Sequence, residues 1–401
     1  MRTEDYDYEL PERLIARHPA ARREDSRLLR VTRPDGRLAH HTFRELPDLL
    51  HPGDLLVLNN TRVFPARLLG RRLPDGGGIE ALLLRQEGEK AWWAMVRPGK
   101  KIKLHDRLVF APGRLEATVA AYGEPSSGER LLEFTWQGDW WRLLEEVGHT
   151  PLPPYILKAR KHDEAGEAAV HAPSFAPEEA EDRGRYQTVY AGQERASVAA
   201  PTAGLHFSPP VLEALERKGI ERVFVQLHVG PGTFQPIKTD EVEDHPMHEE
   251  FIRISVETAR RINRARREGR RIVAIGTTSV RALETAALDE ESLAQVFHPG
   301  PSPILLAPPD RTEEGMMSLF PDSETGDGPV RPLEGWTRLF VKPGFRFRAT
   351  DVLLTNFHLP RSSLLLLVSA FSDTESIRNA YRTAVQEEYH FYSYGDCMLI
   401  D

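Results

Sequence analysis

The sequence predicts an α/β protein with two domains, on the evidence of its length and of two contrasting patterns of apolar residues. A chain of 401 residues exceeds what one hydrophobic core usually organises. Short alternating apolar runs between Gly-rich or charged turns fill residues 64–148, which is typical of a small all-β barrel or sandwich. After Tyr186 strand-like and helix-like segments alternate. This pattern indicates an α/β domain in the second part of the chain.

The N-terminal part contains two predicted elements. Residues 10–16 are expected to form a short helix, which is entered through Pro11 at a first-turn position. Residues 55–58 form an apolar run that ends at a polar Asn-Asn-Thr turn, so a buried strand is expected there.

The predicted small domain contains several short strands. Its alternating runs are residues 79–84, 91–96, 115–120 and 131–135. The segment Pro-Leu-Pro-Pro at 151–154 then marks a stiff exit, because successive prolines favour extended chain.

One strand and helix unit in the main domain is well defined. Ser255 is placed to cap a helix whose apolar stripe runs through Val256, Ala259, Ile262 and Ala265. Gly269 ends that helix, and the apolar residues 271–275 predict a buried strand. The sequence Gly-Thr-Thr-Ser follows at 276–279, and a further helix is expected from about 280 to 287.

Two segments are predicted to be insertions of low complexity. Residues 159–185 are rich in Ala, Glu and Asp, and residues 289–335 carry clustered Pro, Gly and acidic residues. Neither has a sustained hydrophobic period, so no regular structure is expected, although residues 304–307 and 316–320 are apolar enough to pack locally.

The bulk composition favours a soluble protein of the cytosol. The start of the sequence is acidic and has no apolar region of a secretory signal, and the longest apolar run, 364–371, is too short to cross a bilayer. The single cysteine, Cys397, excludes an internal disulfide framework.

Charge does not decide whether the protein binds nucleic acid. A net charge of −8 argues against an indiscriminate nucleic-acid binder, but phosphate binding depends on local patches. Basic islands occur at 97–107, 260–271 and 342–348. The alternative is that each island is a solvated face that balances acidic neighbours.

Generic cofactor and metal motifs are absent. The sequence has no Walker A motif, no GxGxxG between a strand and a helix, and no CxxC or HExxH pattern. His245 and His248 have Pro and Met between them and no cysteine pair nearby, so they do not form a recognised zinc pattern. We therefore expect no metal and no dinucleotide cofactor.

Three polar segments are candidates for ligand binding. A helix that begins near residues 277–279 would present unpaired N–H groups and hydroxyls to an anion, and Arg281 would add a bidentate donor. Residues 200–207 and 227–234 each combine a histidine with glycines that let the backbone approach a ligand, and 356–361 is a polar strand end. The alternatives are a simple helix cap, tight turns around buried histidines, and a polar strand end without a ligand.

Taken together, these segments identify a family. ASVAAPTAGLHF (196–207), LHVGPGTFQPI (227–237), HPMHEE (245–250), GTTSVRALE (276–284), LLTNFHLPRSSLLLLVSAF (353–371) and SYGDCML (393–399) occur in this order. YELPERLIARHP (8–19), VLNNTRVFPARLLG (57–70), PLPPYI (151–156) and YQTVYA (186–191) accompany them. The chain closely resembles the S-adenosylmethionine:tRNA ribosyltransferase-isomerases along nearly its whole length.

The resemblance implies a fold and a reaction. The expected fold is a barrel-like α/β main domain, made of residues 1–63 and 149–401, with a small all-β barrel domain of residues 64–148 inserted near its N-terminal part. The expected reaction moves the ribosyl part of S-adenosylmethionine onto 7-aminomethyl-7-deazaguanine at the tRNA wobble position and isomerises it, which gives epoxyqueuosine-tRNA, adenine and methionine. S-adenosylmethionine is then a consumed co-substrate, no resident cofactor is needed, and tRNA is the partner. We expect a monomer.

The motif positions suggest roles for particular side chains. Because the sulfonium acidifies the 5′ carbon of the ribose, a neutral histidine suits the general base, and a protonated histidine or a carboxylic acid suits the departure of adenine. The candidates for this acid–base chemistry and for orienting a histidine or meeting the sulfonium are His206, His228, His358, Glu250 and Asp396. The candidates for holding the methionyl and adenosyl groups are Thr202, Gly204, Gly230, Gly232, Thr277, Thr278, Ser279, Arg281 and Asn356. Arg62 and Arg67 are candidates for contacts with tRNA phosphates.

Two other functions stay open at this point. A hydrolase or lyase that acts on a small nucleoside would be active without tRNA. A non-enzymatic RNA-binding scaffold would bind tRNA without consuming S-adenosylmethionine.

Overall fold

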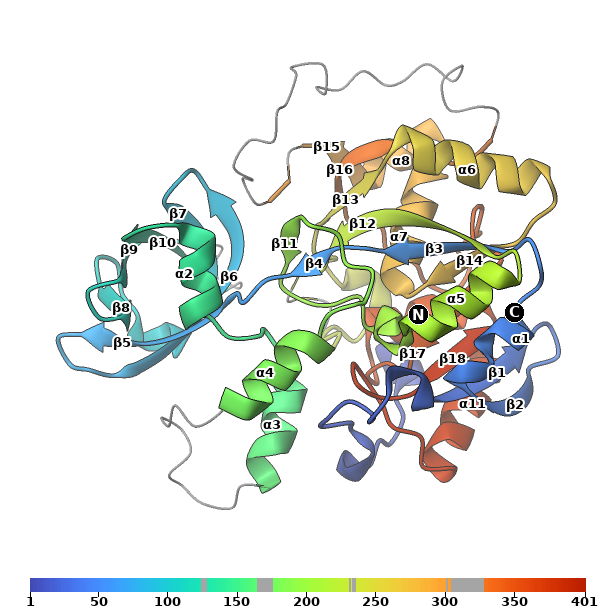
Figure 1. The fold of residues 1–401 in the computed structure, drawn as a ribbon, viewed down its shortest axis with the longest axis horizontal. Coiled ribbons are helices and arrows are strands. Elements are labelled where there is room, and N and C mark those ends of the chain that lie inside the picture. Colours follow the sequence, from blue (N-terminus) through green and yellow to red (C-terminus); the bar gives the residue numbers. More distant parts are fainter. Residues whose placement is uncertain (124–127, 164–175, 231, 233–235, 301, 304–327) are drawn as a thin grey trace.

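A large mixed sheet and a separate closed barrel are the two structural bodies of the chain (Figure 1). The structure is a computed structural model that describes residues 1–123, 128–163, 176–230, 232, 236–300, 302–303 and 328–401. No helix within these ranges is long and apolar enough to cross a membrane.

The large sheet has ten strands with a parallel centre. Four neighbouring strands, β12-β3-β14-β17, run parallel. Antiparallel pairs extend the sheet beyond β12, and beyond β17 two antiparallel pairs flank the parallel pair of β18 and β1. In sheet order the strands are β15 (Phe297–Pro299), β16 (Leu333–Thr337), β13 (Glu250–Ile254), β12 (Glu221–His228), β3 (Leu55–Asn59), β14 (Ile272–Ile275), β17 (Val352–Asn356), β18 (Cys397–Ile400), β1 (Arg27–Thr32) and β2 (Arg37–Thr42).

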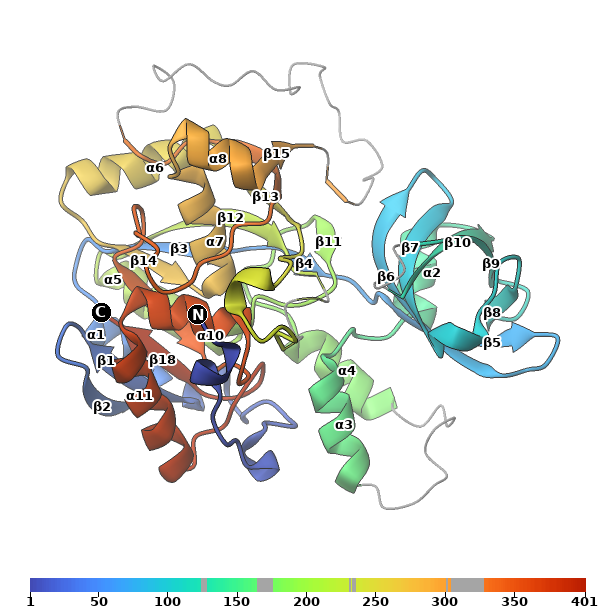
Figure 2. The same ribbon diagram turned by 180° about the vertical axis from the view of Figure 1, so that it is seen from behind.

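Helices cover both faces of this sheet. Side chains of α1 (Leu46–Leu49) and α5 (Pro209–Arg217) pack on one face, against Leu56, Leu58 and Val273. On the other face the apolar sides of four helices pack against Leu55, Val57 and Ala274: α6 (Val256–Arg267), α7 (Thr277–Ala286), α10 (Ser363–Phe371) and α11 (Thr374–Gln386). The five residues of β3 are buried because both sides of the strand are covered. The views from opposite sides agree with this layering (Figure 2).

The barrel is a closed antiparallel ring of six strands with its own apolar core. The ring order is β10 (Glu129–Trp136), β7 (Ala91–Arg97), β6 (Gly78–Glu87), β5 (Arg67–Leu73), β8 (Arg107–Ala111) and β9 (Leu115–Tyr122). Helix α2 (Trp140–Val147) follows β10 and contributes Leu143 and Leu144 to the core. Closure leaves the barrel without edge strands, which explains how a short segment forms a stable body.

Shorter elements join the two bodies. β4 (Arg62–Val63) pairs in parallel with β11 (Arg195–Ser197), next to the connection between sheet and barrel. Helices α3 (Pro154–Asp163) and α4 (Ala176–Arg185) lie side by side beneath this connection (Figures 1 and 2), where Arg160 binds Asp182 with nitrogen–oxygen distances of 2.7 and 2.9 Å. Helix α8 (Glu290–Val296) precedes β15.

The predicted elements of the β-rich segment and of the α6–β14 unit are confirmed. Strands β6, β7, β9 and β10 contain the four alternating runs, β3 contains residues 55–58, and Ser255 Oγ accepts the N–H of Thr258 at the start of α6. Helix α7 begins at Thr277 rather than near 280, directly after Gly276, whose φ of 86° is favourable only for glycine.

Three expectations about the fold are wrong. The described strands of the main sheet have β15 and β2 at its edges, so the sheet is open and not barrel-like. Residues 10–16 form only a 3₁₀ turn at Glu12–Leu14, because the backbone that follows pairs with Phe391 instead of continuing a helix: the N–H of Ala16 donates to the carbonyl oxygen of Phe391 at 3.3 Å, and the N–H of Phe391 donates to that of Leu14 at 2.8 Å. The described parts of 159–185 and 289–335 contain α3, α4, α8, β15 and part of β16, since neighbouring elements supply partners that periodicity cannot show. Residues 304–307 and 316–320 lie outside the described residues.

Candidate active site

Two adjoining cavities lie where the central parallel strands end. Val229 follows β12, Gly276 follows β14, and Phe357 follows β17, and all three line a cavity. The larger cavity has a volume of about 580 Å³ and the smaller about 50 Å³. Val229 and Leu364 line both, so the two cavities share a wall. The carboxyl ends of parallel strands are the usual ligand site of open α/β sheets.

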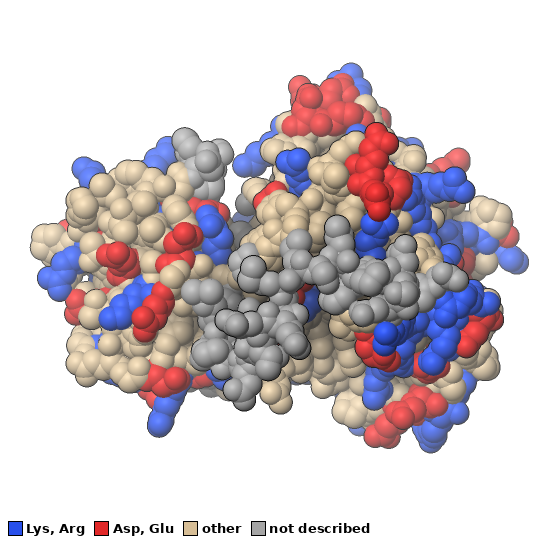
Figure 3. Space-filling view, turned by 90° about the horizontal axis from the view of Figure 1, so that it is seen from above, with Lys and Arg blue, Asp and Glu red and all other residues tan. Residues whose placement is uncertain are grey.

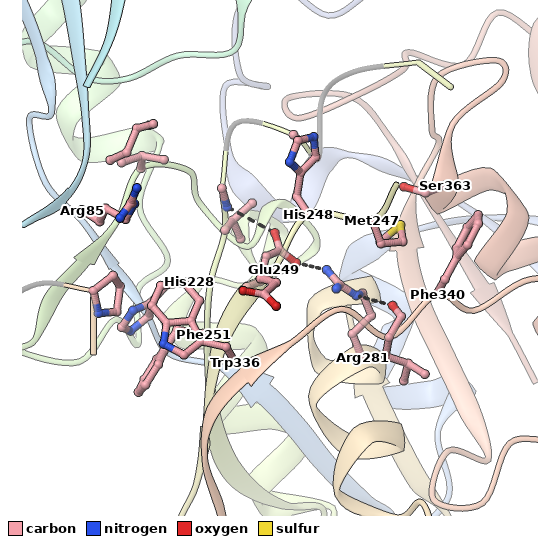
Figure 4. A pocket seen from close by; sticks show the side chains of 18 of the residues that line it. Arg85, His228, Met247, His248, Glu249, Phe251, Arg281, Trp336, Phe340 and Ser363 are labelled. Atoms are coloured by element: carbon pink, nitrogen blue, oxygen red, sulfur yellow. Dashed lines mark hydrogen bonds and ion pairs between the residues drawn. The ribbon is translucent and has the colours of Figure 1, made fainter. Parts of the chain in front are cut away.

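Aromatic side chains form one side of the larger cavity. The ring centroids of His228 and Phe251 are 4.9 Å apart, and those of Phe251 and Trp336 are 5.9 Å apart. Pairing of β13 with β16 places Phe251 directly opposite Trp336. Figure 4 shows these three rings together, with Arg281 and Phe340 on the other side of the cavity. An aromatic wall of this kind offers apolar contact to a planar ligand.

His228 presents a neutral imidazole to the cavity. Neither ring nitrogen has a hydrogen-bond partner among the described residues. Burial, and to a lesser extent the charge of Arg253, lowers the pKa of His228 to about 3. The ring is therefore uncharged near neutral pH, with a nitrogen lone pair that no described residue engages.

Glu250 and Arg281 lie beneath this cavity as a buried ion pair. Glu250 Oε1 also accepts the N–H of Gly230 at 3.2 Å, and Arg281 Nε donates to the carbonyl oxygen of Leu339 at 3.2 Å. Burial lowers the pKa of Arg281 to about 10. The sequence suggested an Arg281 open to a ligand carboxylate, but the structure shows a guanidinium that Glu250 already binds.

The larger cavity contains groups that sequence reasoning missed or placed elsewhere. Glu249 lines it with a side chain that is 44% exposed, and His298 Nε2 lies 3.3 Å from Glu249 Oε2. Met247 is another wall residue. Gly232 lies against the ring of His248, where an added Cβ would be 2.3 Å from His248 Cδ2. The acidic pair at 249–250 was the only sequence signal for Glu249.

The smaller cavity lies at the first turn of α7. Thr202, Thr277 and Thr278 line it, and the buried hydroxyl of Thr278 has no partner among the described residues. A helix N-terminus also presents backbone N–H groups that no earlier turn satisfies. This end of the site therefore offers donors to an anion.

Asn356 and His358 form the opposite wall of the smaller cavity. The buried Oδ1 atom of Asn356 has no hydrogen-bond partner among the described residues. His358 Nε2 lies 2.8 Å from Thr355 Oγ1, and burial lowers the pKa of His358 to about 3. His358 is thus neutral and held by the strand that carries it.

His206 lies behind this wall and lines neither cavity. Its Nε2 accepts a hydrogen bond from Asn356 Nδ2 at 3.2 Å. Burial, and then the charge of Arg23, lowers the pKa of His206 to about 4. Because the ring reaches the cavity only through Asn356, the geometry makes His206 a positioning residue.

Five other sequence candidates lie outside both cavities, each with a structural partner. Ser279 Oγ donates to the carbonyl oxygen of Ile275 at 2.8 Å, and Asp396 accepts the N–H groups of Arg27 and His390, each at 2.7 Å. Gly204 packs where a Cβ would be 2.1 Å from the Tyr190 hydroxyl. Arg62 Nε donates to the carbonyl oxygen of Gly192 at 2.7 Å, and Arg67 pairs with Glu80 at 2.9 Å. Sequence proximity to a motif does not reveal such partners.

The basic island at 260–271 is largely balanced by carboxylates. Glu221 pairs with Arg261 and Arg270, each at 2.8 Å. Arg266 pairs with Asp351 at 3.4 Å. Figure 3 shows Lys and Arg side chains intermixed with Asp and Glu over this end of the main body. These ion pairs favour the solvated face over a phosphate-binding patch.

The fold and the cavities define a class of protein: an α/β enzyme scaffold with a nucleoside-sized, aromatic and carboxylate-bearing site at its strand ends. The family described as Queuosine biosynthesis protein matches residues 3–400, and the chain belongs to this family. The resemblance seen in the motifs is thereby confirmed.

Individual relatives are similar over their full length. A protein named S-adenosylmethionine:tRNA ribosyltransferase-isomerase from Moorella thermoacetica is 45% identical, and one of the same name from Symbiobacterium thermophilum is 44% identical, with 100% of each chain covered in both comparisons. A solved structure of an S-adenosylmethionine tRNA ribosyltransferase from Thermotoga maritima is 34% identical, with 99% of this chain and 100% of that chain covered and a TM-score of 0.48.

Proposed function

We propose that this protein is an S-adenosylmethionine:tRNA ribosyltransferase-isomerase. It transfers the ribosyl part of S-adenosylmethionine to 7-aminomethyl-7-deazaguanine at the tRNA wobble position and isomerises it, so that epoxyqueuosine-tRNA forms and adenine and methionine leave. Relatives of this name match the chain end to end. The observation that carries the proposal is the pair of joined cavities, one walled by aromatic rings and one at a helix N-terminus.

The two cavities suit the two ends of S-adenosylmethionine. A volume of about 580 Å³ accommodates a nucleoside beside the ring of Trp336, which packs against the buried ring of Phe251. The methionyl carboxylate then extends past Val229 and Leu364 to the first turn of α7, where the free hydroxyl of Thr278 and the helix N-terminus favour an anion.

Carboxylates near the larger cavity suit the sulfonium. Glu250 is neutralised by Arg281, whereas Glu249 is partly exposed and meets only the imidazole of His298 at 3.3 Å among the ion pairs of the described residues. We therefore assign the sulfonium to Glu249 rather than to Glu250. The acidic partner would hold the cation without first breaking a buried pair.

His228 is the candidate for the general base. It lies in the larger cavity with both ring nitrogens unengaged and is neutral near pH 7. A proton that leaves the 5′ carbon next to the sulfonium would pass to a nitrogen of this ring. His358 lines the smaller cavity, farther along the site, and we assign it to ligand positioning.

We further propose that S-adenosylmethionine is consumed as a co-substrate without a resident cofactor, that the enzyme acts as a monomer in the cytoplasm, and that the barrel is an inserted domain that helps to hold tRNA. The test is incubation of the purified chain with S-adenosylmethionine and tRNA that carries 7-aminomethyl-7-deazaguanine, followed by mass spectrometry of the products. Adenine release that requires this tRNA supports the proposal. Release from S-adenosylmethionine alone would indicate a small-nucleoside hydrolase or lyase, and tRNA binding without adenine release would indicate an RNA-binding scaffold.

A further inference from the structure

One exposed surface of the barrel combines unpaired cations with an exposed aromatic ring. We call it the barrel basic surface, and it consists of Arg97, Lys100, Lys101, Lys103, Tyr122 and Arg130. Unlike the arginines of α6, its residues Arg97, Lys100, Lys101 and Lys103 are exposed and form no ion pair with any described residue. The ring of Tyr122 is 51% exposed. Solvent-exposed cations without carboxylate partners are free to bind phosphate.

Hydrogen bonds hold this surface together. The N–H of Leu104 donates to the Tyr122 hydroxyl at 2.9 Å, and Arg130 Nη2 donates to the carbonyl oxygen of Gly99 at 3.1 Å. The guanidinium of Arg130 lies 4.5 Å from the centroid of the Tyr122 ring. The lysine-bearing turn, the aromatic ring and the stacked guanidinium are therefore fixed relative to one another.

The barrel basic surface begins at the rim of the larger cavity. Met95 and Glu129 line that cavity and face each other across β7 and β10. Arg97 is two residues beyond Met95 on β7, and Arg130 directly follows Glu129. Arg85 also lines the cavity from the barrel, with its guanidinium 4.8 Å from the centroid of Trp93 (Figure 4). A chain that enters the cavity from this side must cross the barrel.

We infer that the barrel basic surface binds the tRNA anticodon arm next to the wobble nucleotide, an inference that rests on the proposed function. The lysines would contact phosphates, and Tyr122, backed by Arg130, would stack with an unpaired base. Exposed aromatic rings beside unpaired cations are the combination that single-stranded nucleic acid binds, since every base has a face that can stack. Because the whole chain has a net charge of −8, a polyanion such as tRNA needs a local cluster of cations of this kind in order to bind.

The test compares two charge-matched double variants. Lys100→Ala/Lys103→Ala removes two cations of the surface, and Arg217→Ala/Arg382→Ala removes two exposed cations on α5 and α11 of the main body that form no ion pair with described residues. The barrel variant should raise the KM for precursor tRNA about tenfold at low salt, with kcat and the KM for S-adenosylmethionine unchanged. Its slope of log Kd for tRNA against log salt should fall by about 2. The control variant should match the wild type.

Two further variants separate stacking from hydroxyl bonding. Tyr122→Ala should weaken tRNA binding about tenfold, whereas Tyr122→Phe keeps the ring, loses only the hydrogen bond from Leu104 and should retain most of the binding. Direct binding is measured by fluorescence anisotropy, so the result does not depend on turnover. Equal tRNA affinity and equal salt slope for Lys100→Ala/Lys103→Ala and wild type would overturn the inference while leaving adenine release intact. A different outcome would separate the two proposals. If Lys100→Ala/Lys103→Ala binds tRNA more weakly than the wild type, but the wild type itself releases no adenine, the inference about the surface is upheld and the proposed function is overturned.

Discussion

The carboxylate of Glu250 on β13 and the guanidinium of Arg281 on α7 form an ion pair in which the side chains are 4% and 7% exposed. Glu250→Gln should lower the free energy of unfolding by about 3–5 kcal/mol, because a buried cation loses its counter-charge. Urea denaturation measures the change. The double variant Glu250→Gln/Arg281→Met should recover part of the loss, since no uncompensated charge remains. Additive losses in the double variant would show that the two side chains are not energetically coupled.

Three buried histidines should make the protein sensitive to mild acid. Burial lowers the pKa of His206 to about 4 and those of His228 and His358 to about 3, from 6.5 in an unfolded chain. Below pH 6.5 the unfolded state binds protons that the folded state excludes, so stability is full above pH 6.5 and falls as the pH drops toward 4. Each histidine should cost about 2 kcal/mol between pH 7.5 and pH 5.

The measurement is the free energy of unfolding at the two pH values for the wild type and for His206→Gln. The variant lacks one of the three groups, so its loss between pH 7.5 and pH 5 should be smaller by about 2 kcal/mol. Partly buried carboxylates act only at lower pH: burial raises the pKa of Glu179, but bonds to His149, Thr150 and Arg183 lower it to about 2. An unchanged loss in His206→Gln would mean that this histidine is protonated in the folded state.

Two glycines of similar motifs should respond differently to alanine. A Cβ at Gly204 would lie 2.1 Å from the Tyr190 hydroxyl, whereas a Cβ at Gly230 meets no atom within 4 Å. Gly204→Ala should therefore lower the free energy of unfolding by about 1–3 kcal/mol through overpacking. Gly230→Ala should leave stability unchanged and raise the KM for S-adenosylmethionine, because the added methyl group enters the larger cavity. Thermal unfolding and initial rates distinguish the two variants. Equal melting temperatures for Gly204→Ala and the wild type would show that Gly204 is not required for packing.

Local pattern was sufficient for most elements and for part of the site. Alternation predicted the strands of the barrel, and Ser255 with its apolar stripe predicted α6, because these signals depend on near neighbours in the chain. The candidates His228, Gly230, Thr278 and His358 came from motif segments that combine histidines, glycines and hydroxyls, and the structure places all four on the joined cavities.

What the sequence left undetermined depends on distant partners. Arg281 is separated by 31 positions from Glu250, and the sequence next to either residue does not predict their ion pair. His206 and Asn356 are 150 residues apart, so the chain alone does not show that one lies behind the other. Trp336 lies on β16, next to a segment that has no hydrophobic period. The sequence therefore gives no sign that Trp336 belongs to the cavity wall. An open sheet and a closed one likewise differ only in how their edge strands pair.

His228 provides the sharpest separation of stability from chemistry. Its two unpartnered ring nitrogens are buried against Phe251, so His228→Phe removes a desolvation cost while keeping an aromatic ring in the same place. The variant should be as stable as the wild type or more stable by about 1 kcal/mol. If the ring accepts the proton from the 5′ carbon, adenine release should fall by about 100-fold or more, with the KM for S-adenosylmethionine nearly unchanged. A residue that is kept for its chemistry is retained at the expense of stability. The opposite result, a less stable variant with wild-type turnover, would therefore mean that His228 serves packing and that another group accepts the proton.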